Sequence, residues 1–131
     1  MNSRPVKDDL GDVGPAIEWV GGLVDQAGLS PDLRFAVDLS LEEALANLIM
    51  HGRSGDRDKA IVISVAANGE GATVTISDRC TPFDVTEPRS EVVSPMEIGG
   101  RGLKLLQSFA GELSYATCGD QNTLTMRFAA A

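Results

Sequence analysis

Glu43 and Asn47 are the first residues of this chain whose types and spacing suit chemistry. Four residues apart on a helix, they lie on one face, a turn from each other. The amide oxygen of Asn47 could bind a metal ion, and Glu43 could take a proton from an attacking hydroxyl or water. The alternative is structural: both side chains would hydrogen-bond to neighbouring loops, because burying them unpaired is costly.

Two further segments contain residues that could bind an amine-bearing base or phosphate groups. Asp78 ends an apolar run and is followed by Pro82-Phe83-Asp84. Its carboxylate could accept a hydrogen bond from an exocyclic amine such as that of adenine, or it could simply cap a turn. Gly99-Gly100-Arg101-Gly102 precedes a predicted helix, where bare N–H groups suit phosphate and Arg101 could add a charge-assisted contact. A flexible hinge would look the same, and the glycines match neither the P-loop nor the dinucleotide fingerprint.

The elements that position these residues follow from periodicity and turn signals. A helical apolar period predicts helices over residues 15–27, 31–50 and 101–110, and Ser30-Pro31 opens the second one. Runs rich in β-branched or alternating apolar residues predict strands over 60–67, 72–78, 113–117 and 123–128, the first two joined by Asn68-Gly69-Glu70-Gly71. Residues 79–98 contain three prolines and predict a long loop, which we expect to form a lid over the phosphates.

The predicted fold is α+β. Helices segregated from antiparallel hairpins predict a two-layer α/β sandwich, with one mixed, mostly antiparallel sheet and the helices on one face. Residues 1–11 are predicted to be a flexible N-terminal tail, and residues 12–131 to form one domain.

The predicted helix over residues 31–50 has two apolar flanks. A narrow stripe between them holds Ala36, Ser40, Glu43, Asn47 and Met50. A helix that is apolar on two sides is largely buried, so Glu43 and Asn47 are expected at or beside the core. Glu42 points about 100° away and is expected to be a solvated charge.

Composition narrows the classes of function. The formal net charge of −8 argues against a nucleic-acid partner, because phosphate binding needs clustered Lys and Arg. No apolar run approaches the length of a membrane span, and the polar N-terminus is no signal peptide. Cys80 and Cys118 lack metal-ligand spacing, which favours free thiols in a reducing cytoplasm.

Together these segments resemble the GHKL (Bergerat-fold) ATPases, and more closely the small bacterial anti-sigma factor serine kinases, over about residues 13–128. Residues 41–52 are similar to the family's N-box, residues 78–84 to its Asp-x-Gly-x-Pro-Phe-Asp box and residues 99–103 to its second glycine box. The resemblance implies the following roles: Glu43 as general base, Asn47 as Mg²⁺ ligand, Asp78 as reader of adenine, Gly99, Gly100, Arg101, Gly102 and Leu103 around the phosphates, and Thr123 near Asp78.

The implied function is an ATP-binding, anti-sigma-factor-like regulator that uses ATP and Mg²⁺. It would phosphorylate a serine or threonine on a small antagonist protein, or sequester a sigma factor, in a partner-switching pathway. The alternative is a non-catalytic protein-binding module of the same fold with weak or no nucleotide binding. The expected location is the cytoplasm, and the family allows a homodimer.

Three departures from the family pattern bear on these expectations. Cys80 replaces the glycine of the second motif, so its side chain could crowd the adenine pocket. Gly111 stands where many relatives carry aspartate. The segment before Asp12 shows no edge-strand pattern, so the sheet is expected to have four strands. His51, the single histidine, is expected to mark the end of its helix.

Overall fold

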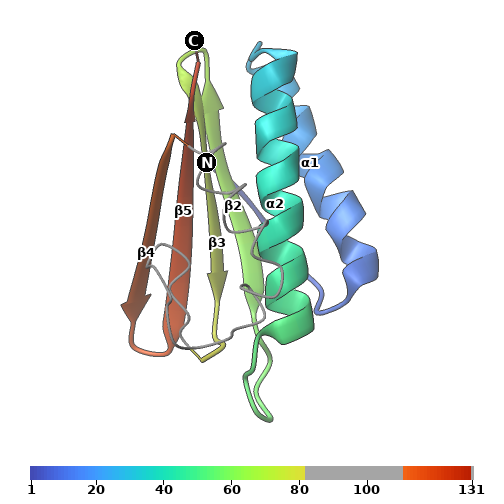
Figure 1. The fold of residues 1–131 in the computed structure, drawn as a ribbon, viewed down its shortest axis with the longest axis vertical. Helices are drawn as coiled ribbons and strands as arrows, with labels where there is room; N and C mark the ends of the chain where they lie inside the picture. Colours follow the sequence, from blue (N-terminus) through green and yellow to red (C-terminus); the bar gives the residue numbers. More distant parts are fainter. Residues whose placement is uncertain (82–110, 131) are drawn as a thin grey trace, which may run out of the picture.

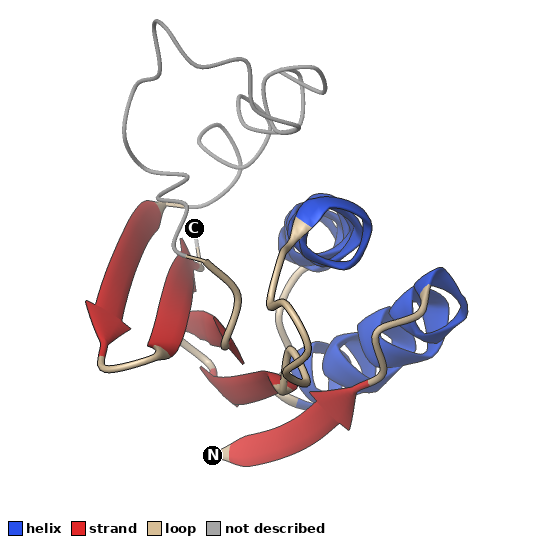
Figure 2. Cartoon of the chain, turned by 90° about the horizontal axis from the view of Figure 1, so that it is seen from below, coloured by secondary structure: helices blue, strands red, loops and turns tan. Residues whose placement is uncertain are grey.

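The computed structural model describes residues 1–81 and 111–130, which form one sheet with two helices on one of its faces (Figures 1 and 2). The strands are β1 (Asn2–Val6), β2 (Ile61–Asn68), β3 (Gly71–Asp78), β4 (Glu112–Cys118) and β5 (Gln121–Ala129); the helices are α1 (Val13–Gln26), α2 (Pro31–His51) and a short 3-10 turn, η1 (Leu10–Asp12). The predicted lid and third helix lie outside the described residues. This arrangement confirms the predicted α+β class with helices on one face of the sheet.

The sheet is antiparallel in all its described pairings, so the expectation of a mixed sheet is not met in this part of the chain. The strand order is β1-β2-β3-β5-β4. The predicted hairpin between β2 and β3 is confirmed, with Asn68 paired to Gly71 across the turn. The register between β3 and β5 places Asp78 opposite Asn122 at one end of the sheet and Ala72 opposite Phe128 at the other.

The N-terminal segment corrects the sequence prediction. Residues 2–6 are not a flexible tail: they form the edge strand β1, so the sheet has five strands rather than four. The strand is short, and Val6 is its only buried residue, so it carries no alternating apolar signal. Pro5 is tolerated because one side of an edge strand needs no partner. Arg4 then fixes the segment through two hydrogen bonds, of 3.0 and 3.2 Å, to the carboxylate of Asp12.

The core lies between the inner face of the sheet and the helices. Along β3 the residues alternate, so that Ala72, Val74 and Ile76 are buried against the helix layer. In α2, four residues of one predicted apolar flank are buried: Val37, Leu41, Ala44 and Leu45. The other flank is less covered, since Phe35 remains 58% exposed. Neither described helix has the length and apolarity that crossing a membrane requires.

Both ends of α2 are fixed by side chains. Ser30 accepts a hydrogen bond from the N–H of Leu33 at 3.1 Å, which confirms the predicted N-cap. At the other end the helix stops at His51, as predicted, and the buried ammonium of Lys59 donates to the carbonyls of Leu48 and Ile49 at 3.3 and 2.8 Å. A cation beside the last carbonyls of a helix stabilises it through the helix dipole.

Candidate functional site

The C-terminal end of α2 and the end of β3 lie together at one end of the fold (Figure 1). Two backbone hydrogen bonds of 2.7 Å hold the chain after β3 to the segment after α2: Arg79 N–H donates to Lys59 C=O, and Thr81 N–H donates to Arg53 C=O. A side chain on Gly52 would place its Cβ 2.9 Å from the sulfur of Cys80. The helix with the acid and the amide is therefore anchored to the strand end with Asp78.

Asn47 is half-buried, and its side chain is turned back onto its own helix. Its Nδ2 donates to the backbone carbonyl of Glu43 at 2.8 Å. This bond uses the nitrogen and leaves Oδ1 as the acceptor, with no hydrogen bond recorded to it within residues 1–81 and 111–130. An amide oxygen is a suitable ligand for Mg²⁺, which usually keeps water molecules and substrate phosphates as its other ligands.

Glu43 is also half-buried, as predicted for the stripe between the apolar flanks, whereas Glu42 is exposed. In the part of the chain that the structure describes, no ion pair engages the Glu43 carboxylate. The hydrogen bond between its carbonyl and Asn47 places the two residues one turn apart. A carboxylate without a fixed cationic partner is available to accept a proton, which is the property that a general base needs.

Asp78 is buried, with 8% of its surface exposed, at the end of β3. Its Oδ1 accepts two hydrogen bonds, from Cys80 N–H at 2.8 Å and from Asn122 Nδ2 at 3.0 Å. The first bond shows that Asp78 does cap its own turn, as the structural alternative predicted. Both of these bonds fall on Oδ1, and among the described residues the Cys80 thiol makes a further hydrogen bond to the Asp78 carboxylate.

Asn122 is the partner of Asp78 that sequence reasoning missed. Residues opposite each other in an antiparallel pair point to the same face, and Asn122 pairs with Asp78, whereas the predicted Thr123 pairs with Ser77 on the outer face. The Thr123 side chain therefore lies on the other face of the sheet from the Asp78 side chain, and its part in cofactor binding stays a prediction. The sequence did contain a signal for Asn122. It lies two residues before Leu124 and four before Met126, so it shares the buried face of β5 with these apolar residues.

Cys80, which replaces the family glycine, is buried, and its sulfur lies against Gly52 at the end of α2. Burial first, and then the negative charge of Asp78, raise the pKa of this thiol to about 11. The thiol is thus protonated at neutral pH and acts as a small apolar side chain. Whether it crowds an adenine base stays a prediction.

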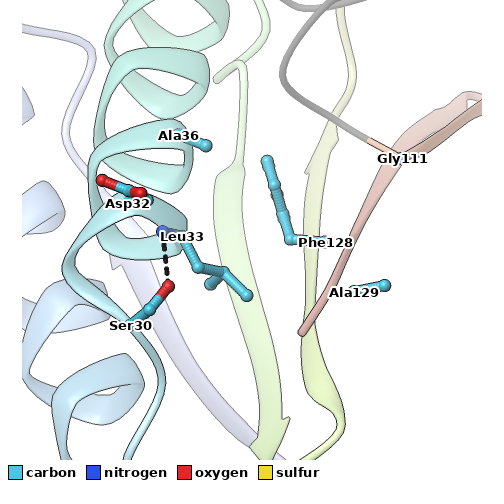
Figure 3. Close-up of a pocket in the computed structure, with 7 residues that line it drawn as sticks. All are labelled: Ser30, Asp32, Leu33, Ala36, Gly111, Phe128 and Ala129. Carbon is cyan, nitrogen blue, oxygen red and sulfur yellow. Dashed lines mark hydrogen bonds between the residues drawn. The ribbon is translucent and has the colours of Figure 1, made fainter. Parts of the chain in front are cut away.

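The remaining predicted site residues are Gly99, Gly100, Arg101, Gly102 and Leu103, and they lie outside the described residues. A groove of about 290 Å³ is found at the opposite end of α2, where Leu33 and Phe128 point into the space between α2 and β5 (Figure 3). Ser30, Asp32, Ala36, Gly111 and Ala129 complete its lining. None of the candidate residues that the structure describes borders this groove, so we assign it no part in the site.

Comparison with known proteins shows the family of the chain. The family model described as the histidine kinase-like ATPase domain matches residues 6–128. The serine/threonine-protein kinase BtrW of Bordetella bronchiseptica is 27% identical over 115 residues, which cover 85% of this chain and 81% of that protein. The serine-protein kinase RsbW of Listeria monocytogenes is 26% identical over 103 residues, and these cover 72% of this chain but only 65% of RsbW.

Solved structures agree on the fold. The RsbU and RsbW domains of Rv1364c from Mycobacterium tuberculosis match with a TM-score of 0.72 at 14% identity, over 98% of this chain and 31% of that one. The Acinetobacter baumannii histidine kinase AdeS matches with a TM-score of 0.54 at 18% identity, over 99% of this chain and 68% of that one. At these identities the structural matches concern the fold alone. The family model spans nearly the whole sequence, and the chain belongs to the histidine kinase-like ATPase domain family.

Proposed function

We propose that this chain is an ATP-dependent protein kinase of the anti-sigma-factor type, which phosphorylates a serine or threonine of a small antagonist protein in a partner-switching pathway. The observation that carries the proposal is the arrangement on α2. The nitrogen of Asn47 is fixed by the Glu43 carbonyl, which turns its amide oxygen into the group that could hold Mg²⁺, and Glu43 lies one turn earlier with no ion pair among the described residues. The names of the relatives BtrW and RsbW, both protein kinases, support the same reaction.

Each site residue has a separate role in the proposed phosphoryl transfer. Asp78 would accept a hydrogen bond from the exocyclic amine of adenine, and the amide oxygen of Asn47 would hold Mg²⁺. When bound, MgATP supplies the phosphoryl group and the metal charge that offsets its developing negative charge. Glu43 would take the proton of the attacking hydroxyl while the new oxygen–phosphorus bond forms and the bond to the leaving ADP oxygen breaks. Gly99–Leu103, with Arg101, would complete the contacts to the phosphates.

The partners and the location follow from the same proposal. The protein would bind an antagonist protein, a sigma factor, or both, in the cytoplasm. A homodimer is compatible with this scheme. Regulation of transcription would then be exerted through the sigma factor rather than by contact of this acidic chain with nucleic acid.

Binding and chemistry can be tested separately. Calorimetric titration with ATP should show binding to the wild-type protein that strengthens with Mg²⁺, and Asn47→Ala should lose the effect of Mg²⁺. Absence of heat with wild type, or an unchanged Mg²⁺ effect in Asn47→Ala, would reject the proposed nucleotide site.

Glu43→Gln should bind ATP normally and transfer phosphate at least ~100-fold more slowly to a cognate substrate protein, because a base acts only in the transition state. The matched control is Glu42→Gln, one residue away and exposed, which should transfer at the wild-type rate. Equal rates for Glu43→Gln and wild type would show that Glu43 is structural.

One observation favours a second candidate function, a non-catalytic protein-binding module. Cys80 stands in place of a glycine two residues after the aspartate that would read the base. If this side chain closes the site, wild type will not bind ATP, and Cys80→Gly will restore binding. Binding of ATP by wild type would exclude this candidate.

A further inference from the structure

A chain of hydrogen bonds runs across three strands at the end of the sheet that holds Asp78. Thr117 on β4 donates through its hydroxyl to Oδ1 of Asn122 at 3.0 Å. Asn122 on β5 donates through Nδ2 to Oδ1 of Asp78 at 3.0 Å and to the carbonyl of Cys80 at 2.6 Å. Cys80 N–H in turn donates to Asp78 at 2.8 Å. Thr117, Asn122, Asp78 and the Cys80 backbone thus form one connected network.

The network leaves Asn122 with a single orientation. A primary amide has two N–H donors and one carbonyl acceptor, and all three are engaged here. Rotating the amide by half a turn would set its oxygen against the Asp78 carboxylate and the Cys80 carbonyl, so the assignment of its two ends is unambiguous. Only 1% of Asn122 is exposed, so water does not compete for these bonds. The residue is therefore a rigid donor aimed at one oxygen of Asp78.

We infer that Asn122 is a positioning residue for base recognition: it occupies Oδ1 of Asp78 and so directs Oδ2 to the exocyclic amine of an adenine base, with Thr117 fixing Asn122. The inference rests on the proposed function, since it assigns a role within the same nucleotide site. A buried carboxylate requires donors, and the Asn122 amide and the Cys80 N–H supply two of them at Oδ1. A carboxylate oxygen is an acceptor only, so at the position of the exocyclic group it favours an amino group over the oxo group of guanine.

The residue type matters as well as its position. A threonine hydroxyl has one proton to donate, whereas the two N–H groups of Asn122 bridge Asp78 and the Cys80 carbonyl at the same time. The backbone after β3 is thereby tied to β5. Asn122 fixes both the carboxylate and the turn on which Cys80 replaces a glycine.

The test is the ratio of equilibrium dissociation constants for ADP and GDP, measured by calorimetry without a phosphoacceptor. Wild type should prefer ADP. Asn122→Ala should weaken ADP about tenfold, as loss of a hydrogen bond to a charged group does, while GDP affinity stays the same. Thr125→Val, on the outer face of the same strand, is the matched control and should keep the wild-type ratio. Thr123→Val should also keep it if Asn122, not Thr123, serves Asp78.

Asn122→Asp keeps the shape and gives a second, independent readout. It sets two carboxylates against each other, so one of them must bind a proton. The ratio of ADP affinity in this variant to that in wild type should then change between about pH 6 and about pH 8, because titration of the ADP phosphate is common to both proteins. If Asn122→Ala fails to fold, Asn122→Asp still tests whether Asn122 positions the Asp78 carboxylate.

The possible results distinguish failure of the proposed function from failure of the role inferred for Asn122. If wild type binds neither ATP nor ADP, the proposed function fails, and this inference fails with it. If wild type binds ADP and Asn122→Ala keeps the ratio of ADP to GDP affinity, or Asn122→Asp binds ADP like wild type at every pH, the inference alone is overturned.

Discussion

Lys59→Met should destabilise the protein by about 2–3 kcal/mol, most of it through the end of α2. The Lys59 ammonium is buried and makes three contacts, with the carbonyls of Ile49 and Leu48 and, at 2.8 Å, with the carboxylate of Asp8. Methionine keeps most of the apolar stem, so the substitution removes the charge and its hydrogen bonds without opening a large cavity.

The three contacts are unequal. The Leu48 carbonyl also accepts from Gly52 N–H at 2.9 Å, so it keeps a partner after the substitution. The Ile49 carbonyl has no second hydrogen bond recorded in the described chain, and leaving it unpaired costs about 1–3 kcal/mol. Loss of the cation at the helix end adds about 0.5–1 kcal/mol. The ion pair contributes at most about 1 kcal/mol, because the Asp8 side chain is 47% exposed and solvent screens it.

Urea unfolding without nucleotide, followed by the fluorescence of Trp19, measures this difference. With an m-value of about 2 kcal/mol/M, the midpoint should fall by about 1 M and the m-value should stay constant. Asp8→Asn is the matched control: it removes only the ion pair, so it should cost less than about 1 kcal/mol, and less still in high salt.

Two results would refute this reasoning. If Lys59→Met stays within about 0.5 kcal/mol of wild type, the helix-end carbonyls do not need the ammonium. If Asp8→Asn costs as much as Lys59→Met, the ion pair carries the effect and the carbonyl contacts do not.

Three further predictions concern pH, thiol reactivity and packing. The Arg4 hydrogen bonds hold the pKa of Asp12 below its usual value, so the stability lost in Asp12→Asn should be constant at neutral pH and shrink as pH falls below about 4 in urea titrations. At pH 8, about one Cys80 thiol in a thousand is ionised, so iodoacetamide should label exposed Cys118 and spare Cys80 until urea unfolds the chain. Gly52→Ala should cost about 2 kcal/mol, measured as a shift of the urea midpoint, because its Cβ would overlap a helix carbonyl and lie 2.9 Å from the Cys80 sulfur.

Each of these has a clear contrary result. A stability difference for Asp12→Asn that does not shrink with acid would mean that the Arg4 contact is absent in solution. Equal labelling rates for the two cysteines in the native protein would contradict the burial of Cys80. A neutral Gly52→Ala would show that the end of α2 can move away from β3.

Local patterns were enough to predict most of the fold. Helix α2 was predicted from Ser30 to within a residue of its end, because an N-cap, a proline in the first turn and a glycine after the last turn are all local signals. The β2–β3 hairpin was predicted for the same reason. Strand β1 was missed because only its last residue is buried, so its pairing with β2 is stabilised by main-chain bonds that leave no pattern in the side chains.

Local patterns likewise predicted some features of the candidate site and missed others. The placement of Glu43 and Asn47 on one half-buried face follows from helical spacing and is confirmed, while their chemical roles stay predictions. The alternation along β5 places Asn122 rather than Thr123 on the same face as Asp78, and the role of Thr123 stays a prediction. Lys59 could not be predicted, because its partners come from α2 and the N-terminal segment, far apart in the sequence.

The edge strand β1 has a consequence for the solubility of the protein. Strand β2, which it covers, begins Ile61-Val-Ile-Ser-Val65, an apolar, β-branched segment without charge or proline. Such a segment with a free edge is a template for intermolecular strand pairing. β1 pairs with that edge of β2. Because β1 carries Pro5 and Arg4, its own outer edge is a poor template for pairing with a further strand. Shortening the chain to begin at Asp12, where the sequence pattern alone would set the domain boundary, should uncover β2 and lead to aggregation.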